Sequence, residues 1–350
     1  MALLALSIAV LVSGCKREDA ARLPALGADI TKTSTTGISS GAYMAGQFQV
    51  AHARLVVGAA IIAGGPYGCA ESLFADMMPG PGTTFLNLSK AINGCMLNAL
   101  QIWGVPNPPL LADRVRSLAG KGRIDGVEHL VGDRVYLYSG SADRTVVTPI
   151  VAAAAEFYRE VGLKPEAVAF HADAAAGHAF VTEDKGDRCD YSGKPYIVDC
   201  DYDQAGELLN HIHGPLHPRV AAPGGTFAEF DQRDFTHDLG LDHGLSDFGV
   251  VYIPPVCWSG GCRVHIAFHG CAQNRAAVGD AFVRDTGFAR WADSNGFIVL
   301  FPQTAAGATN PQACWDWWGY TGRDYLTREG AQIEAVHRML QRLGQAGAGS

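Results

Sequence analysis

One glycine-rich segment near the start of the chain, Gly37-Ile38-Ser39-Ser40-Gly41, constrains the fold more than any other feature. It fits the G-x-S-x-G pattern of a nucleophile elbow, a tight strand-to-helix turn that projects a serine hydroxyl. In enzymes that use such a turn, several strands and an oxyanion loop normally precede it. Only 36 residues precede Gly37 here. Either the pattern is accidental, or the chain is reordered.

Candidate partners for Ser39 follow later predicted strands. A nucleophilic serine needs a base, and the base needs an orienting carboxylate. Asp143 comes just after the strand in "VYLYSGSAD", and His178 follows the next strand in "AFHADAAAGH". His171 lies within that strand and is interpreted as structural. Ser39, Asp143 and His178 therefore occur in the chain order of α/β-hydrolase triads, each after a predicted strand.

The missing early part of such a fold occurs near the other end of the chain. An apolar strand in "VHIAFHGC" leads into His269-Gly270-Cys271, which resembles an oxyanion loop. A helix and strand follow in "ADSNGFIVLFPQT". The terminal helix in "AQIEAVHRML" would lead, in an unpermuted chain, into a strand at Thr33 to Thr36. We therefore predict a circular permutation; the alternative is that "HGC" is only a turn.

The pattern of apolar runs predicts the fold class. Short β-branched runs alternate with helical periodicity, as in an α/β fold with a mostly parallel central sheet and helices on both faces. No repeat or linker announces a second module, so we expect a single domain, a circularly permuted α/β-hydrolase. Residues 189–247 carry weaker periodicity and are predicted to form loops, a small hairpin or a cap. The predicted strands occupy residues 56–65, 133–143, 166–178, 248–255, 263–271 and 296–304.

Charge argues against one class of partner. The formal net charge is -8 and the pI is near 5.8, and no segment clusters Lys and Arg as phosphate binding requires. A nucleic-acid partner is therefore not expected, and a neutral or apolar substrate fits better. The predicted chemistry needs no cofactor and no metal. We expect a monomer.

The first residues predict export. "MALLALSIAVLVSGCKRED" is too short an apolar run to span a bilayer permanently, and its "VSGC" ending resembles a lipoprotein signal acylated at Cys15. No Lys or Arg precedes the run, so translation can start upstream of Met1. The alternatives are a plain secretory signal and a buried helix. We expect a signal peptide at 1–15, a short linker at 16–28 and the catalytic domain at 29–345. The product would be periplasmic, at the cell surface or secreted.

The cysteine count also favours an oxidising compartment. Without Cys15, eight cysteines remain, an even number that suggests disulfides. Zinc is the alternative, but no C-x-x-C pair exists, and His211 and His213 near Cys200 lack well-spaced partners. Pairing by proximity, which sequence alone does not prove, gives Cys69 with Cys95, Cys189 with Cys200, Cys257 with Cys262, and Cys271 with Cys314.

Five motifs together carry a family resemblance. "GISSGAYMA", "GSAD", "GHAF", "AFHGCAQN" and "CWDWWGY" resemble poly(3-hydroxybutyrate) depolymerases whose permuted catalytic domain begins with the lipase box. The resemblance covers nearly the whole chain after the signal. It implies an esterase with Ser39 as nucleophile, His178 as general base and then acid, and Asp143 as the residue that orients His178.

The resemblance also implies further site residues. Carried over by motif, the backbone N–H groups of Ser40 and Cys271 would form the oxyanion hole, and these are the donors that this fold aims at a developing oxyanion. A tryptophan near "CWDWWGY" lines the cleft in the family. Trp315 is the first choice and Trp317 the second, although core packing is the alternative for at least one of Trp315, Trp317 and Trp318. His269 is also expected beside the substrate.

Three functions remain open from the sequence. The first is hydrolysis of poly(3-hydroxybutyrate) or its oligomers through an acyl-enzyme. The second keeps the triad but cleaves feruloyl or acetyl esters of plant polysaccharide. The third is a surface protein that binds polymer or glycan through the aromatic loop with a decayed site. No separate substrate-binding domain is visible, which favours amorphous polymer or soluble oligomers over crystalline polymer.

Overall fold

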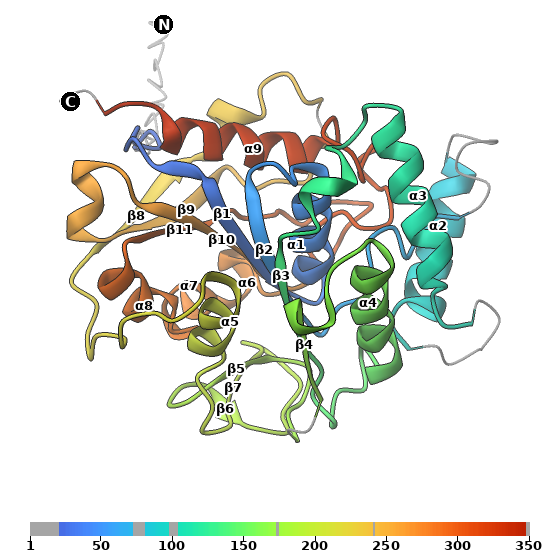
Figure 1. Cartoon of the computed structure of the whole chain (residues 1–350), viewed down its shortest axis with the longest axis horizontal. Helices are drawn as coiled ribbons and strands as arrows, with labels where there is room; N and C mark the ends of the chain where they lie inside the picture. The colour runs from blue at the N-terminus through green and yellow to red at the C-terminus, as the bar shows by residue number, and fades with distance from the viewer. Residues whose placement is uncertain (1–20, 73–80, 98–103, 173–174, 241, 348–350) are drawn as a thin grey trace, which may run out of the picture.

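A twisted eight-stranded sheet forms the centre of the protein (Figure 1). The structure is a computed structural model and describes residues 21–72, 81–97, 104–172, 175–240 and 242–347. The strand order is β4-β3-β2-β1-β10-β11-β9-β8. The strands are β1 (Asp29–Ile38), β2 (Val56–Ile62), β3 (Arg134–Tyr138), β4 (Val168–His171), β8 (Thr226–Asp231), β9 (Phe248–Ile253), β10 (Arg263–Phe268) and β11 (Phe297–Phe301). A second, small sheet has the order β5-β7-β6, with β5 (Phe180–Thr182), β6 (Asp187–Arg188) and β7 (Ile197–Asp199).

Strand directions confirm the predicted fold class. The six strands from β4 to β11 in the sheet order run parallel. Only β9 and β8 at one edge pair antiparallel, β9 with β11 and β8 with β9. All six strands predicted after the nucleophile turn are present, although each is shorter than its apolar run because the run continues into the loop at the edge of the sheet.

The sheet order confirms the circular permutation. β1, the first strand of the chain, pairs with β2 on one side and with the late strand β10 on the other. The end of α9 (Ala331–Gly344) lies beside the start of β1 (Figure 1). The N–H groups of Leu26 and Ala28 donate to the carbonyl of Leu343 at 3.1 and 3.0 Å. In an unpermuted chain α9 would therefore continue directly into β1.

Helices cover both faces of the sheet because the strand side chains alternate. Ala59 and Ile61 of β2 face one hydrophobic cluster, and Ala60 and Ile62 face the other. Helices α1, α3, α4 and α9 pack on the first face, and α5, α7 and α8 on the second. The helices are α1 (Ser40–Ala51), α2 (Pro81–Gly94), α3 (Pro108–Gly120), α4 (Thr148–Glu160), α5 (Gln204–His213), α6 (Arg275–Val278), α7 (Ala281–Asp285) and α8 (Phe288–Asn295), besides α9.

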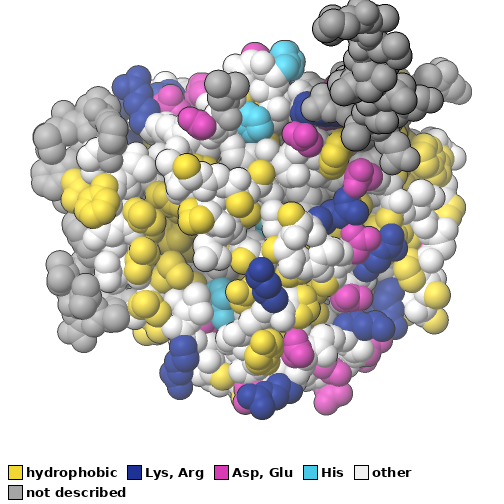
Figure 2. Space-filling view, turned by 180° about the vertical axis from the view of Figure 1, so that it is seen from behind, with side chains coloured by type: hydrophobic (Ala, Val, Ile, Leu, Met, Phe, Trp, Pro, Cys, Tyr) yellow, Lys and Arg dark blue, Asp and Glu magenta, His cyan; other side chains and the backbone are white. Residues whose placement is uncertain are grey.

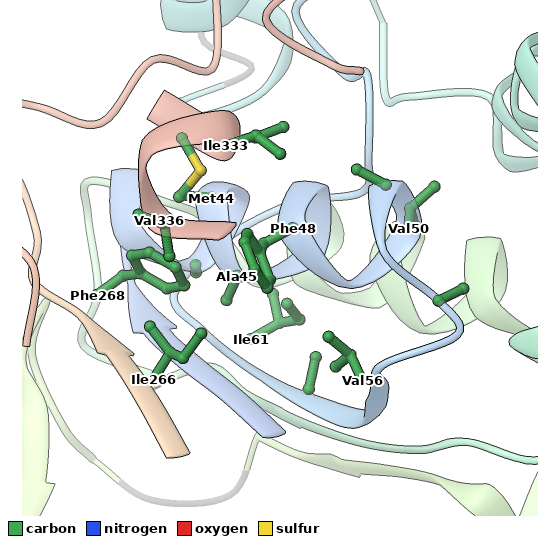
Figure 3. Packing of buried hydrophobic residues seen from close by; sticks show 14 of the residues in the cluster. Met44, Ala45, Phe48, Val50, Val56, Ile61, Ile266, Phe268, Ile333 and Val336 are labelled. Atoms are coloured by element: carbon green, nitrogen blue, oxygen red, sulfur yellow. The ribbon is translucent and has the colours of Figure 1, made fainter. Parts of the chain in front are cut away.

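Helix α1 is buried along its whole length. All twelve of its residues are buried, as expected for a helix whose residues are mostly small or apolar around its whole circumference. Figure 3 shows Phe48 between Ile61 of β2 and Phe268 of β10, with Val336 of α9 on the far side. The helix that begins at the predicted nucleophile is thus held by both neighbouring strands and by the end of the chain.

Three segments differ from the sequence expectation. The helix predicted before the strand at 296–304 is divided into α7 and α8, because Gly287 between them adopts φ 85°. Residues 189–247 contain α5 and the edge strand β8 besides loops. Helices α2 and α3 were not predicted.

The predicted linker at 16–28 also differs where it is described. Leu23 and Leu26 are 1% and 4% exposed and belong to the main hydrophobic cluster. The N–H group of Asp231 donates to the carbonyl of Ala21, and the Nε of Arg342 donates to the carbonyl of Leu23. Residues 21–28 therefore pack as part of the catalytic domain, because they fill the space between α9 and β8.

The surface has one distinctly apolar side. Figure 2 shows hydrophobic side chains gathered on the side of α2 and α3, while charged side chains of both signs are interspersed elsewhere on that face. Phe85 and Leu110 are 71% and 51% exposed there, and Ile92 and Val105 are also exposed. Among the described residues, no helix is long and apolar enough to cross a membrane.

Buried histidines surround the middle of the sheet. His265 of β10 and His213 of α5 both bond to Ser34 of β1, with ring nitrogens 2.8 and 2.9 Å from its Oγ. Burial lowers the pKa of His213 and of His265 to about 3. Burial likewise lowers the pKa of His52, at the end of α1, to about 3. The folded protein therefore holds these rings neutral at pH values where an unfolded chain protonates them.

These histidines predict acid sensitivity. Their folded pKa lies below the ordinary value near 6.5, so stability is present above about pH 6.5 and is lost as the pH falls towards the folded pKa. We expect the free energy of unfolding to fall between pH 6.5 and 4. Denaturant unfolding at several pH values measures the slope, to which each histidine contributes about 1.4 kcal/mol per pH unit.

A single variant isolates one of these contributions. His265→Asn is expected to reduce the slope by about one proton, whereas His217→Asn, at an exposed position, serves as the matched control. An unchanged slope in His265→Asn would contradict the assignment.

Candidate active site

Ser39 stands at a sharp turn between β1 and α1. Its backbone adopts φ 57° and ψ -122°, a conformation that L residues rarely take and that aims the side chain away from both elements. The Ser39 N–H group donates to the carbonyl of Ile62 at 2.9 Å, which fixes the turn to the end of β2. The residue is 9% exposed. This geometry is that of a nucleophile elbow.

The two glycines of the motif are required by close backbone contacts. A Cβ on Gly37 would lie 1.9 Å from the carbonyl oxygen of Gly41. A Cβ on Gly41 would lie 2.3 Å from the carbonyl oxygen of Phe268 and 2.4 Å from that of His269. Glycine thus allows the turn to close and allows the first turn of α1 to press against the end of β10.

Asp143 and His178 form a buried hydrogen-bonded pair. His178 Nδ1 lies 2.8 Å from Asp143 Oδ2, and the residues are 6% and 3% exposed. The other carboxylate oxygen, Oδ1, accepts the N–H groups of Thr145 and Val146 at 2.7 and 3.0 Å. The N–H group of His178 donates to Ser192 Oγ at 2.7 Å. With the carboxylate at Nδ1, the Nε2 atom of His178 is the one that can act as a base.

Hydrogen bonds along one edge of the sheet link the strand ends that precede the serine and this pair. The carboxyl ends of parallel strands meet at one edge, and Ser39, Asp143 and His178 each follow such an end. The N–H group of Ala63, just after β2, donates to the carbonyl of Tyr138 at the end of β3. The N–H group of Ser139, just after β3, donates to the carbonyl of His171 at the end of β4. The ends of β2, β3 and β4 are therefore linked in sequence.

Further glycines allow the two loops of the pair to touch. A Cβ on Gly140 would lie 2.1 Å from the carbonyl oxygen of Ala176. Since Gly140 precedes Asp143 and Ala176 precedes His178, this contact brings the acid turn against the histidine loop. The Ala142 N–H group donates to the same carbonyl at 3.1 Å.

The turn after β10 lies close to the nucleophile turn. Gly270 approaches the nucleophile so closely that a Cβ on it would lie 3.4 Å from Ser39 Cβ. Two residues on, Ala272 has φ 52°, and its N–H group donates to the carbonyl of Gln312. Ser40 is the first residue of α1, so its own N–H group has no intrahelical acceptor. Backbone donors from both segments therefore adjoin Ser39.

His269 is buried and braces this turn. Its Nε2 accepts the N–H group of Thr304 at 3.2 Å, so Nδ1 carries the proton and donates to the carbonyl of Gly270 at 2.7 Å. Burial lowers its pKa to about 4. The substrate contact predicted for His269 does not fit this burial, since the side chain is 0% exposed and both ring nitrogens bond to the protein.

All four predicted disulfides are present. Each pair of cysteines is close in sequence, as pairing by proximity predicted. Cys271–Cys314 joins the oxyanion turn to the tryptophan loop, and Cys69–Cys95 lies in the same small hydrophobic cluster. Cys15 lies outside the described residues.

The tryptophans of "CWDWWGY" are more buried than expected. Trp315 is 0% exposed and packs edge-to-face on Phe268, so it does not form the open cleft wall predicted for it. Trp317, stacked on Tyr43 with ring centroids 4.0 Å apart, is 5% exposed. Its predicted contact with substrate stays a prediction. The periodicity of the sequence could not separate the packing face of this loop from its open face, because the loop has no regular structure.

A cavity of about 1090 Å³ opens beside this aromatic cluster. It lies between α2, α3 and residues 308–327, and its wall includes Phe85, Leu88 and Trp318. The apolar surface of α2 and α3 adjoins it. Among the described residues, no group of three or more His, Cys, Asp or Glu side chains is arranged to hold a metal ion.

Two residues without a role predicted from the sequence contact the site. Ser192 accepts the N–H group of His178, and Gln273 Oε1 accepts the N–H group of Gly270 at 2.7 Å. Gln273 lies within the quoted "FHGCAQN" motif, which is a signal that could have identified it. Ser192 lies in an irregular segment and offered none.

Comparisons with known proteins identify relatives of this chain. No family model matches the chain. A poly(3-hydroxybutyrate) depolymerase of Delftia acidovorans is 38% identical over 338 residues, which cover 95% of this chain and 63% of that protein. A polyhydroxybutyrate depolymerase of Talaromyces funiculosus is 31% identical over 345 residues, which cover 92% of each. The chain therefore spans less than two thirds of the Delftia protein and nearly all of the Talaromyces one.

Two solved structures share the fold. A PHB depolymerase complexed with an R3HB trimer superposes with a TM-score of 0.80 at 29% identity. The crystal structure of a PHB depolymerase from Penicillium funiculosum gives 0.80 at 28%. Each match covers 93% of this chain and 100% of the other. The chain belongs to the poly(3-hydroxybutyrate) depolymerase family, whose members are carboxylic ester hydrolases.

Proposed function

We propose that this chain is a serine esterase that hydrolyses poly(3-hydroxybutyrate) or 3-hydroxybutyrate oligomers through an acyl-enzyme. The observation that carries the proposal is the buried Asp143–His178 pair at the sheet edge where Ser39 occupies a strained elbow. Relatives named as depolymerases of this polyester, and a related structure that holds its trimer, support the choice of substrate. The protein acts as a monomer, a state that sedimentation would test.

The reaction follows from the roles of the three side chains. His178 Nε2 takes the proton of Ser39 Oγ as that oxygen attacks the ester carbonyl, and the tetrahedral intermediate forms. The ester C–O bond then breaks, and His178 gives its proton to the departing alcohol. Water, deprotonated by His178, attacks the acyl-enzyme and releases the acid and Ser39. Asp143 holds His178 in the required tautomer throughout.

Two backbone donors would stabilise the negative charge that develops on the carbonyl oxygen. These are the N–H groups of Ser40 and Cys271, which flank the nucleophile from α1 and from the turn after β10. Each such donor lowers the barrier by about 2.7 to 4 kcal/mol in comparable enzymes. Because the fold fixes backbone donors, the direction of the Cys271 N–H group depends on how rigidly the turn after β10 is held.

The apolar side formed by α2 and α3 suits a methyl-bearing polyester. Phe85 and Leu110 expose most of their side chains, and the cavity beside Trp318 extends this surface inward. Exposed apolar patches of this kind mark binding surfaces in soluble proteins. We assign the binding of amorphous polymer to this side of the molecule.

Ser39→Ala is expected to abolish release of 3-hydroxybutyrate, by about 10⁴-fold or more, while folding and binding to amorphous polymer persist. His178→Ala should lose activity in the same way. His171→Ala is the matched control and should retain it, because His171 lies at the end of β4 outside the pair. Mass spectrometry of the products from amorphous polymer and from the trimer measures the outcome. Substantial cleavage by Ser39→Ala would refute the mechanism, and cleavage of only feruloyl or acetyl esters by the parent would refute the substrate.

The disulfide beside the oxyanion turn should matter for turnover as well as stability. Cys271→Ala/Cys314→Ala is expected to lower kcat about 10-fold or more, because the bridge fixes the turn that carries the Cys271 N–H group. Cys257→Ala/Cys262→Ala removes a bridge that lies outside the site and should keep kcat within about twofold. Both variants are assayed on p-nitrophenyl butyrate below their Tm. Equal kcat losses in both would show that the effect is only structural.

We propose further that the chain is exported and acylated at Cys15 after cleavage of the signal peptide immediately before that cysteine. Four disulfides in the described residues support an oxidising compartment. Intact-mass analysis of protein purified from membranes should show a diacylglycerol-modified Cys15 at the N-terminus. A soluble mature protein with an unmodified cysteine, or without it, would indicate a plain secretory signal instead. Residues 29–345, together with the packed segment 21–28, form the catalytic domain in this proposal.

A further inference from the structure

We infer that Gln273 is a positioning residue that fixes the oxyanion turn relative to the loop that carries His178. The inference rests on the proposed function, which gives both segments their catalytic roles. Gln273 lies between β10 and α6, is 1% exposed, and has no part in the triad or the oxyanion hole. Its side chain makes three hydrogen bonds that join two segments nearly eighty residues apart.

One end of the amide holds the oxyanion turn. The side-chain Oε1 of Gln273 accepts the Gly270 N–H group at 2.7 Å. The backbone N–H group of Gln273 donates to the carbonyl of Gly270 at 3.3 Å. Gly270 is thus bonded at both its N–H and its carbonyl to this one residue. Since Gly270 lies close to Ser39 and immediately precedes Cys271, these bonds set where the Cys271 N–H group points.

The other end of the amide binds the segment at Pro195 and Tyr196, which packs against the loop that carries His178. Gln273 Nε2 donates to the carbonyls of Pro195 and Tyr196, both at 3.0 Å. The Tyr196 carbonyl also accepts the N–H group of Phe180 at 2.9 Å, two residues after His178. The Tyr196 ring meets the His178 ring edge-on, with centroids 6.5 Å apart. A single carbonyl therefore separates the Gln273 amide from the histidine loop.

Only an uncharged amide satisfies all these partners. The Gly270 N–H group needs an acceptor, whereas the two carbonyls need donors, so the amide has one possible orientation. A carboxylate would face two carbonyl oxygens without a proton between them, and an apolar side chain would remove the partner of the Gly270 N–H group and of the Pro195 carbonyl. Such groups are costly in a site shielded from water. The Gln273 side chain therefore fixes the distance between the Cys271 N–H group, the proposed oxyanion donor, and His178, the proposed base.

A second glutamine provides a matched control. Gln232 is 0% exposed, and its Nε2 donates to the carbonyls of Ser246 and Gln303 at 2.7 and 2.9 Å. Its Oε1 accepts the Gln303 N–H group at 2.9 Å. The hydrogen-bond pattern equals that of Gln273, but the segments joined carry neither Ser39, His178 nor Cys271. Equivalent substitutions at the two sites remove the same bonds with different consequences.

The test compares Gln273→Met with Gln232→Met on p-nitrophenyl butyrate. We expect Gln273→Met to lower kcat about 10- to 100-fold with KM changed less than about threefold, because misplaced groups cost rate more than binding. The inhibition constant of a trifluoromethyl ketone, which forms a tetrahedral adduct with the serine, should rise by the same factor as kcat/KM falls. In a Ser39→Ala background, the Kd of the hydroxybutyrate trimer should stay within about twofold. Gln232→Met should lower Tm comparably and leave kcat and the inhibition constant unchanged.

A lower Tm with an unchanged kcat in Gln273→Met would overturn the inference. Equal decreases of kcat in Gln273→Met and Gln232→Met would also overturn it. Should Gln273→Met fail to fold, Gln273→Glu replaces it. Its buried carboxyl can donate one hydrogen bond when protonated and none when ionised, so its kcat relative to the parent should fall as the pH rises. Gln232→Glu should show a pH-dependent Tm but a parental pH profile of kcat. A flat kcat ratio in Gln273→Glu would also overturn the inference.

The failure of this inference is distinguishable from failure of the proposed function. The activated ester and the ketone report Ser39, His178 and the oxyanion hole whatever the natural ester is. A parent that cleaves p-nitrophenyl butyrate but no hydroxybutyrate ester would refute the substrate and leave the role of Gln273 to be decided. A parent whose Ser39 does not react with the ketone would refute the mechanism itself.

Discussion

The contact between the first turn of α1 and the end of β10 holds the rest of the site in place. Gly41 lies against the carbonyls of Phe268 and His269 at a distance that no other residue allows. The nucleophile turn and the oxyanion turn are therefore in direct backbone contact, with no side chain to adjust between them. Everything else in the site is arranged around this junction: α1 is buried on every side, and the loops of Asp143 and His178 lean on the neighbouring strand ends.

Around that junction, hydrogen bonds from polar side chains hold the segments together, whereas hydrophobic packing does so elsewhere in the fold. His269 ties the oxyanion turn to Thr304, and Gln273 ties it to Pro195 and Tyr196. Buried polar groups are specific in geometry because each must find its partner. The two hydrophobic clusters fix the sheet and its helices. The positions of the side chains and turns at the site depend instead on a few hydrogen bonds between buried polar groups.

The sequence carried most of the architecture because periodicity and motif order are local properties. The strand ends at Asp143 and His178 followed from apolar runs that stop at turn residues, and the permutation followed from the late position of His269-Gly270-Cys271. Burial inside an irregular loop is different, since it depends on which distant segments meet. Trp315 and His269 therefore looked like substrate contacts, although tertiary packing buries both. Helix α5 and strand β8 were likewise hidden in a segment rich in glycine, proline and histidine.

The neighbourhood of the two chain ends has a consequence for how the molecule assembles. In the centre of the sheet Ser34 pairs with His265, so β1 can pair early with β2 but waits for more than two hundred further residues before its other partner, β10, exists. All four disulfides close much shorter loops, the longest between residues 43 apart. Cross-links can therefore form segment by segment without committing the central pairing. The order of the strands leaves the nucleophile turn without the neighbouring turn at Gly270 and Cys271 until β10 has been made, so the two sides of the site come together only late in synthesis.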